Sequence, residues 1–261
     1  SDEVFNCIQK NSNVGYSTEL FGKDNHADRL ITYAASFGNT TLEKLEKYQK
    51  ANEVGNLLKK FDAISVRDAN SGSIVEQLTG EEPVYNLDPV LTYDYMNCCN
   101  RIPQIKATEK YLILYAYAGR ISNDEADWIA EYAKKKNLKV YAIGGIQKCA
   151  DRFVDCSPFE VLAYFRNAEE VITDTFHGSI FSVITHRPFT TLIRKSVGNS
   201  YGNEEKLSDL LNRLGLTERM TTKVEDTERI NQQPIDYEKV DDVLQKQREI
   251  AKKYLQNNIE G

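Results

Sequence analysis

Short apolar runs, rich in β-branched and aromatic residues, alternate with amphipathic stretches along most of the chain. The apolar runs predict β-strands, and the amphipathic stretches between them predict helices. The expected strands are residues 29–36, 62–67, 83–88, 110–118, 139–144, 169–174 and 189–194. The expected helices are residues 41–60, 71–79, 122–136, 157–167, 178–187, 203–214 and 236–257.

Helix-start signals support several of these boundaries. Ser122 stands ahead of Asp124 and Glu125, and Ser157 stands directly before Pro158, as is typical of helix starts. Near-continuous apolar strands that alternate with helices are typical of a parallel sheet covered on both faces. The sequence therefore predicts an α/β protein in which parallel sheets are flanked by helices.

The stretch 93–110 lacks clear periodicity and contains Pro103. We expect a boundary there, which gives an N-terminal α/β lobe at 1–105 and a C-terminal Rossmann-like lobe at 106–235. Residues 236–261 form an amphipathic helix whose apolar face must pack on another part of the protein. Two arrangements are open: the helix packs across both lobes, or it covers the second lobe alone.

Composition narrows the class of protein. The 261 residues are 41% hydrophobic and 28% charged, which is typical of a soluble globular protein. No apolar run approaches the roughly 20 residues of a membrane-spanning helix, so we expect no transmembrane segment. A net charge of −6, with acids and bases mixed, disfavours nucleic acid as a partner. Five scattered cysteines and three histidines predict reduced thiols in the cytoplasm and no metal site.

A histidine lies where a ligand is expected. In open parallel sheets, ligands bind beyond the carboxyl ends of the strands, and the expected strand 169–174 is followed closely by His177 and Gly178. A helix that starts at Gly178 and Ser179 would offer its N–H groups and positive dipole end to an anion. His177 would then exchange a proton with a bound anionic substrate. The alternative is that His177 only caps the helix or fills a gap beneath the loop.

Cations follow two other expected strands. Arg67 ends the expected strand 62–67 and stands next to Asp68, while Arg194 ends the expected strand 189–194 and is followed by Lys195. Each of these cations could hold an anionic substrate, and each could equally be a surface residue, with Arg67 paired to Asp68.

Three further side chains are assigned from their positions alone. Tyr115 and Tyr117 alternate along the strand 110–118, and we expect at least one of them to pack in the core. His186 stands at the end of an expected helix, where the helix dipole favours a surface imidazole.

Several motifs resemble one known family. The segments "SDEVFN", "ITYAASFG", "FDAISVRDANSG", "NLDPVL" and "VITDTFHGSIFSVITHRPF" occur in the order found in polysaccharide pyruvyl transferases, and "GNEEKLSDLLNRLGL" resembles the C-terminal segment of that family. The resemblance covers nearly the whole chain. It implies two Rossmann-like lobes similar to those of GT-B glycosyltransferases, with the active site between them. In the family a strand and a glycine-rich loop precede the "SD…N" segment, so we expect the first lobe to be N-terminally incomplete.

The resemblance also implies roles for individual residues. The family's active-site histidine falls at His177, and an arginine of its first-lobe motif falls at Arg67. Thr175 stands at a position where some branches of the family carry arginine. We expect His177 and Arg67 to be catalytic. The residues expected to bind substrate are Gly38, Asp68, Thr175, Gly178, Ser179, Arg194 and Lys195.

The function implied by the resemblance is transfer of the enolpyruvyl unit of phosphoenolpyruvate to a saccharide, with formation of a pyruvyl ketal and release of phosphate. The expected acceptor is a nucleotide- or lipid-linked saccharide of a bacterial cell-surface glycan or exopolysaccharide. Such an enzyme would work in the cytoplasm, close to the membrane where its acceptor is lipid-linked. It would need no metal and no cofactor, because phosphoenolpyruvate is the donor substrate. The oligomeric state is open.

Two other functions are compatible with the same scaffold. One is a nucleotide-sugar glycosyltransferase, although the chain has no Asp or Glu between Thr175 and Arg194 that could grip a ribose. The other is a non-catalytic glycan-binding relative that kept the substrate cleft and lost the donor site.

Overall fold

The computed structural model describes residues 3–8, 16–194 and 204–259. By residue contacts the chain divides into two compact units. Unit 1 comprises Ser1–Tyr93 together with Asp242–Gly261, and unit 2 comprises Asp94–Asp241. The sequence placed its boundaries at about residues 105 and 235, whereas the contacts divide the chain after Tyr93 and after Asp241.

Unit 1 holds a small parallel sheet and several helices. Strands β1 and β2 pair in parallel, with Ser65 opposite Val84 and Val66 opposite Tyr85. The described elements are η1 (Glu19–Phe21), α1 (Leu42–Lys47), α2 (Ala51–Leu58), β1 (Ser65–Val66), α3 (Ala69–Thr79), β2 (Val84–Tyr85), α4 (Pro89–Thr92) and the residues of α11 (Tyr237–Ile259) from Asp242 onward.

The segment 29–36 does not form the strand that its apolar pattern predicted. Only two isolated parallel bridges are present, at Ile31 and Ala35. Ala34 has a positive φ of 47°, which interrupts extended backbone. The side chain of Thr32 exchanges hydrogen bonds with the backbone of Ser65, at 2.8 Å each, so side-chain contacts replace part of a strand ladder here. The predicted helix 41–60 is likewise two helices, because Gln49 lies between them at a φ of 57°.

The core of unit 1 is aromatic and draws on both ends of the chain. Phe5 is fully buried and stacks on Phe21 with ring centroids 4.5 Å apart, and both rings lie near Phe37. From α11, the hydroxyl of Tyr254 donates a hydrogen bond to the carbonyl of Thr32 at 2.7 Å. The part of α11 from Asp242 onward is therefore in the same unit as Phe5 and Thr32.

Unit 2 is built around a six-stranded parallel sheet in the order β5-β4-β3-β6-β7-β8. This confirms the predicted α/β class with parallel strands. The elements are α5 (Tyr95–Cys98), β3 (Tyr111–Tyr115), α6 (Asn123–Lys135), β4 (Lys139–Ile143), β5 (Arg152–Phe153), α7 (Pro158–Asn167), β6 (Glu170–Thr173), α8 (Phe176–Ile184), β7 (Phe189–Leu192), α9 (Glu204–Arg213), η2 (Thr217–Arg219), β8 (Met220–Thr221), η3 (Val224–Asp226) and α10 (Thr227–Gln232).

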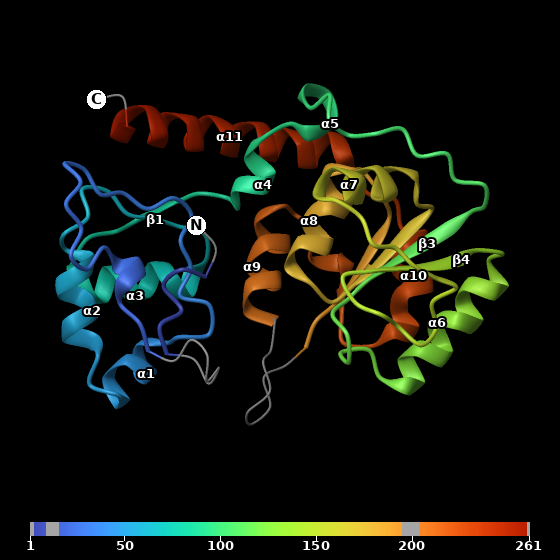
Figure 1. Ribbon diagram of the computed structural model, residues 1–261, viewed down its shortest axis with the longest axis horizontal. Helices are drawn as coiled ribbons and strands as arrows, with labels where there is room; N and C mark the ends of the chain where they lie inside the picture. The colour runs from blue at the N-terminus through green and yellow to red at the C-terminus, as the bar shows by residue number, and fades with distance from the viewer. Residues whose placement is uncertain (1–2, 9–15, 195–203, 260–261) are drawn as a thin grey trace. The chain divides into compact units, whose positions relative to one another are not determined.

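Helices cover both faces of this sheet (Figure 1). On one face, Leu112 and Leu114 of β3 pack in one cluster with Ile129 of α6. On the other face, Tyr115 makes edge-to-face contacts with Phe165 of α7 and Phe181 of α8. Alternate residues of one strand thus point to opposite layers, and both layers are apolar. This explains why the strands read as continuous apolar runs.

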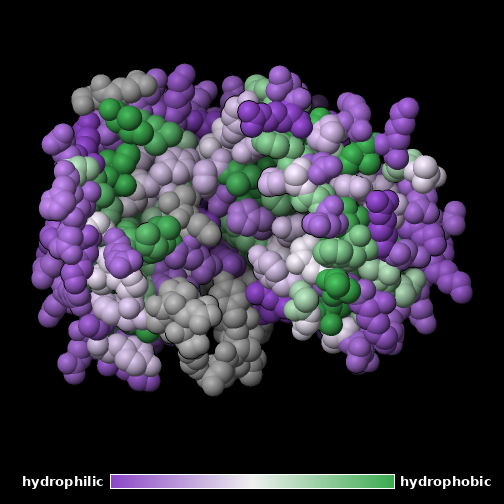
Figure 2. Space-filling view, viewed as in Figure 1, coloured by the Kyte–Doolittle hydropathy of each residue, from purple (hydrophilic) through white to green (hydrophobic). Residues whose placement is uncertain are grey.

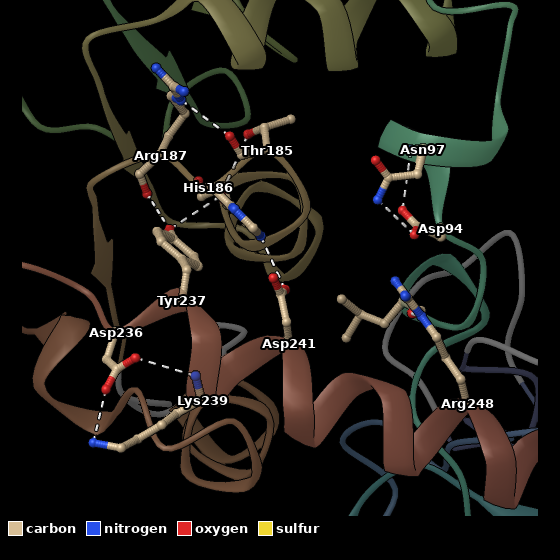
Figure 3. A network of polar contacts seen from close by, with 12 residues as sticks. Asp94, Asn97, Thr185, His186, Arg187, Asp236, Tyr237, Lys239, Asp241 and Arg248 are labelled. Atoms are coloured by element: carbon tan, nitrogen blue, oxygen red, sulfur yellow. Dashed lines mark hydrogen bonds and ion pairs between the residues drawn. The ribbon is translucent and has the colours of Figure 1, made fainter.

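The first turn of α11 packs on the end of α8 (Figure 3). The His186 ring stacks on Tyr237 at 4.3 Å, and its Nε2 lies 3.1 Å from Oδ1 of Asp241. The Tyr237 hydroxyl donates to the carbonyl of Arg187 at 2.6 Å. His186 remains about half exposed at a helix end, as the sequence predicted, and its contacts serve packing.

Hydrophilic residues cover most of the face shown in Figure 2, and apolar residues are exposed there in small groups. None of the helices in the described part of the chain combines the length and the apolar character needed to cross a membrane.

Candidate functional site

The carboxyl edge of the unit 2 sheet collects most of the predicted site residues. The register places Tyr115 of β3 beside Thr173 of β6, and Thr173 beside Thr191 of β7. Residues that follow these three strands therefore emerge at one edge. They include the Tyr117–Arg120 turn after β3, the segment Asp174–His177 after β6, and Arg194 after β7.

The turn into α8 is fixed by hydroxyl groups. Thr175 is the N-cap, and its Oγ1 accepts a hydrogen bond from the backbone N–H of Gly178 at 2.9 Å. Thr173 Oγ1 accepts from the backbone N–H of Thr175 at 3.0 Å and donates to the carbonyl of Tyr115 at 2.7 Å. A Cβ on Gly178 would lie 2.0 Å from Thr173 Oγ1, so only glycine fits. Thr175 and Gly178 thus shape the turn, whatever they bind.

Ser179 is directed into the protein. It is fully buried, and its Oγ lies 3.2 Å from the carbonyl of Thr175 and 2.9 Å from Oγ1 of Thr191. These contacts tie α8 to β7. The predicted role of Ser179 in substrate binding stays a prediction, and its observed contacts are structural.

His177 is on the first turn of α8 and is partly exposed. Its ring centroid lies 5.7 Å from that of Phe176 and 6.0 Å from that of Phe181. Its neighbours on these two sides are aromatic, and the position after β6 puts its imidazole at the sheet edge where ligands bind in this class of fold. An imidazole can both donate and accept a proton, which is what general acid–base catalysis requires.

Arg194 is held by an acid that sequence reasoning assigned only to a helix start. Its Nη1 lies 2.6 Å from Oε1 of Glu125, and Oε2 of Glu125 accepts from the backbone N–H of Ser122 at 2.9 Å. Burial raises the pKa of Glu125, but the hydrogen bonds from Arg194 and Ser122 outweigh burial and leave the pKa below its ordinary value. One carboxylate therefore caps α6 and orients a cation at the sheet edge.

Asp174 is the charged residue that the sequence-based selection missed. Its side chain is completely buried between the end of β6 and the cap Thr175. Burial raises the pKa of Asp174, and the nearby guanidinium groups of Arg120 and Arg194 counteract part of that rise. A carboxylate in such a place is a functional-site candidate. The sequence signal that could have identified Asp174 is an acidic residue directly after a buried strand.

The predicted residues of unit 1 form a compact group of their own. Arg67 pairs with Asp88 at 2.9 Å, and the two side chains are only 4% and 3% exposed. Asp68 is the N-cap of α3 and accepts from the backbone N–H of Ser71 at 2.8 Å and from the hydroxyl of Ser36 at 2.6 Å. Arg67 is therefore not a surface arginine paired with Asp68, because it is buried and pairs with Asp88. Its role in binding an anionic substrate stays a prediction.

Gly38 lies close to this group. It has a φ of 54°, and a Cβ there would lie 2.5 Å from the Glu3 carboxylate. The structure thus brings Gly38, Arg67 and Asp68 together in unit 1, and Thr175, His177, Gly178, Ser179 and Arg194 together in unit 2. Lys195 lies outside the described residues. Within the ranges that the structure describes, no group of three or more His, Cys, Asp or Glu is arranged to hold a metal ion.

Solved structures similar to this chain include three glycosyltransferases. A kitacinnamycin glycosyltransferase is 10% identical with a TM-score of 0.46, and the match covers 80% of this chain and 57% of that one. A mutant O-GlcNAc transferase of Thermobaculum terrenum is 15% identical, with a TM-score of 0.35 and coverage of 76% and 41%. SnogD from Streptomyces nogalater is 9% identical, with a TM-score of 0.35 and coverage of 81% and 71%. The chain therefore spans little more than half the length of the first of these proteins.

A comparison with curated protein sequences gives no significant match. By contrast, residues 10–196 match the sequence model of the polysaccharide pyruvyl transferases. This match spans most of the 261 residues and includes Arg67, Asp174 and His177. It agrees with the resemblance inferred from the motifs, and the chain belongs to the polysaccharide pyruvyl transferase family.

Proposed function

We propose that this protein is a transferase that moves the enolpyruvyl unit of phosphoenolpyruvate to a saccharide and forms a pyruvyl ketal. The observation that carries the proposal is the family match over residues 10–196. The acceptor is a nucleotide- or lipid-linked saccharide used for a bacterial cell-surface glycan or exopolysaccharide. The reaction takes place in the cytoplasm, next to the membrane when the acceptor is lipid-linked.

The chemistry sets clear demands on the protein. Protonation of the methylene carbon of phosphoenolpyruvate makes the neighbouring carbon electrophilic, and a sugar hydroxyl then adds to that carbon. Phosphate leaves with the electron pair of the carbon–oxygen bond, and a second hydroxyl of the same sugar takes its place and closes the ketal. The protein must therefore supply a general acid, a base for the hydroxyl protons, and cations for the phosphate and carboxylate.

Residues at the unit 2 sheet edge suit these demands. His177 is the general acid and afterwards the base, because an imidazole can both donate and accept a proton. Arg194, oriented by Glu125 at 2.6 Å, holds an anionic group of the donor, and Lys195 adds a second positive charge. The start of α8 contributes the positive end of its dipole. In unit 1, Arg67 remains a proposed catalytic residue, and Asp68 and Gly38 remain proposed substrate-binding residues.

Phosphate release from phosphoenolpyruvate, measured in the presence of candidate saccharides, tests this function. The His177→Gln variant keeps a polar side chain but loses the titratable imidazole, so phosphate release should fall by about 10²–10⁴-fold. The matched control is His186→Gln, which changes a histidine at the other end of the same helix and should keep most of the activity. The ketal methyl group, detected by NMR on the acceptor, identifies the product.

Undiminished phosphate release from His177→Gln would remove this residue from the catalytic role. Sugar transfer from a nucleotide sugar, without any pyruvylated product from phosphoenolpyruvate, would overturn the proposed function itself.

A further inference from the structure

An exposed aromatic ring and an arginine stand side by side at the same sheet edge as His177. Tyr115, at the end of β3, packs inward against Phe165 and Phe181, whereas Tyr117 is 49% exposed. The guanidinium carbon of Arg120 lies 4.6 Å from the centroid of the Tyr117 ring. This distance is within the range of a favourable cation–π contact. Nothing in the proposed chemistry above uses either side chain.

The backbone turn that joins the two residues sets their geometry. The N–H of Arg120 donates to the carbonyl of Tyr117 at 3.3 Å, which closes a four-residue turn. Gly119 occupies the third position of that turn with a φ of 78°, a conformation that favours glycine. The turn thus brings Arg120 back beside Tyr117, so that its guanidinium lies over the ring.

Residues after β4 support the same turn through hydrogen bonds and a close backbone contact. Gln147 is almost fully buried, and its amide donates to the carbonyls of Ala116 at 3.0 Å and Tyr117 at 3.3 Å. A Cβ on Gly145 would lie 2.3 Å from the backbone nitrogen of Ala118, so the two loops touch backbone to backbone. Burying a glutamine side chain for two carbonyl groups of an exposed turn indicates that the turn is held in one conformation.

The position of the pair connects it with the charged residues of the site. β3 and β6 are neighbours, with Tyr115 opposite Thr173, so the turn lies beside the segment that carries Asp174 and His177. The buried carboxylate of Asp174 attracts the Arg120 guanidinium. The guanidinium thus lies near both the Asp174 carboxylate and the Tyr117 ring, and the tyrosine remains 49% exposed and accessible to a ligand.

We propose that Tyr117 and Arg120 form a binding subsite for a pyranosyl phosphate, with the sugar ring against the tyrosine and the phosphate on the guanidinium. An aromatic ring offers an amphipathic, rigid surface to the apolar face of a sugar ring, and a guanidinium binds phosphate through paired N–H donors. The choice of a saccharide rests on the proposed function, because nucleotide- and lipid-linked acceptors share a sugar ring bonded to phosphate. The subsite therefore holds the acceptor beside His177.

Binding of glucose 1-phosphate, measured by titration calorimetry or ligand-observed NMR, tests the subsite directly. Glucose, inorganic phosphate and phosphoenolpyruvate are titrated in parallel. We expect Tyr117→Ala to weaken glucose 1-phosphate by about tenfold, a loss typical of removing one packed ring face. The same variant should leave phosphate and phosphoenolpyruvate unchanged, whereas Arg120→Gln should weaken glucose 1-phosphate and leave any binding of glucose unchanged.

Two further variants keep the test decisive. Tyr117→Phe keeps the ring and should bind as the wild type does, so it reports on stacking even if the alanine variant fails to fold. Tyr48→Ala is the matched control, because Tyr48 is also exposed and also has a neighbouring cation, Lys47, at 5.7 Å, but it stands at the end of α1. This control should bind glucose 1-phosphate normally.

Equal affinity of wild type and Tyr117→Ala for glucose 1-phosphate, or no binding by the wild type, would overturn the subsite. Loss of phosphoenolpyruvate binding in Arg120→Gln, with glucose 1-phosphate unaffected, would assign the arginine to the donor and also overturn it. Failure of the proposed function is separate: Tyr117-dependent binding without pyruvyl transfer would leave the subsite standing. Pyruvyl transfer by Tyr117→Ala at an unchanged acceptor KM would leave the function standing and reject the subsite.

Discussion

Both units contain buried aspartates close to arginines, but the electrostatic surroundings of these carboxylates differ. In unit 1, Arg67 is matched by Asp88 at 2.9 Å, both are almost inaccessible, and Asp68 caps a helix. In unit 2, Asp174 is equally buried, but the desolvation of its carboxylate outweighs the attraction of the nearby arginines. In the first arrangement each buried charge has a matched partner, whereas in the second the ionised form of the acid is disfavoured by its burial, which is more typical of a functional site.

The largest expected effect concerns the buried pair of unit 1. Arg67→Met should lower the free energy of unfolding by about 3–5 kcal/mol, because the carboxylate of Asp88 stays buried without its guanidinium. The double variant Arg67→Met with Asp88→Asn should recover part of the loss, since the buried charge is removed. Urea unfolding measures both.

The exposed pair Lys148 and Asp127 provides the matched control, and Lys148→Met should change stability very little. If Arg67→Met kept full stability but lost phosphate release, the contrast would break, because Arg67 would then act mainly on substrate.

A smaller effect is expected at the turn into α8. Gly178→Ala should cost about 1–3 kcal/mol, because the new methyl group would collide with Thr173 Oγ1 and force the capped turn to shift. Thr175→Ser keeps the capping hydroxyl and should be close to wild type. Thermal and urea unfolding report the difference. An unchanged stability for Gly178→Ala would mean that this turn adapts readily and does not fix the position of His177.

The third expected effect is on the free energy of unfolding, and replacing a buried aspartate by asparagine should change it in opposite directions in the two units. Because burial raises the pKa of Asp174 above its unfolded value of 3.8, the folded state loses stability as the pH rises from 3.8 through the folded pKa. Asp174→Asn removes this loss, so it should raise the free energy of unfolding at pH 7, with a smaller gain below pH 3.8. Asp88→Asn should lower stability at pH 7, because its carboxylate is paired.

Urea unfolding of both asparagine variants at several pH values measures this contrast. A destabilised Asp174→Asn at pH 7 would place Asp174 among the structural acids and remove the difference between the units.

Sequence patterns were sufficient to predict those strands whose residues are determined mainly by one physical effect. Burial on both faces made β3, β4, β6 and β7 continuous apolar runs, so their positions could be predicted. The two-residue strands β5 and β8 carry no such run and were missed. The positive φ values of Ala34 and Gln49 broke a predicted strand and a predicted helix. Neither alanine nor glutamine favours a positive φ, so these interruptions could not be predicted from residue type.

The same holds for the site. The order of strand, histidine and glycine placed His177 at the sheet edge from sequence alone. The two partners of Glu125 could not be predicted together, because Ser122 is three residues away and Arg194 is 69 residues away. Similarly, Arg67 and Asp88 meet across 21 residues, so an adjacent Asp68 was the partner that the sequence suggested.

The discontinuity of unit 1 has a consequence for biosynthesis. Phe5 belongs to the same compact unit as Ala251, and Thr32 receives a hydrogen bond from Tyr254. During translation, the residues up to Tyr93 leave the ribosome long before α11 has been synthesised. Unit 2, whose residues are contiguous, can form its sheet before the residues of α11 that complete unit 1 have been synthesised. A ribosome that stalls before the codons of α11 would therefore release a polypeptide in which the residues up to Tyr93, more than those of unit 2, are left for chaperones and proteases to handle.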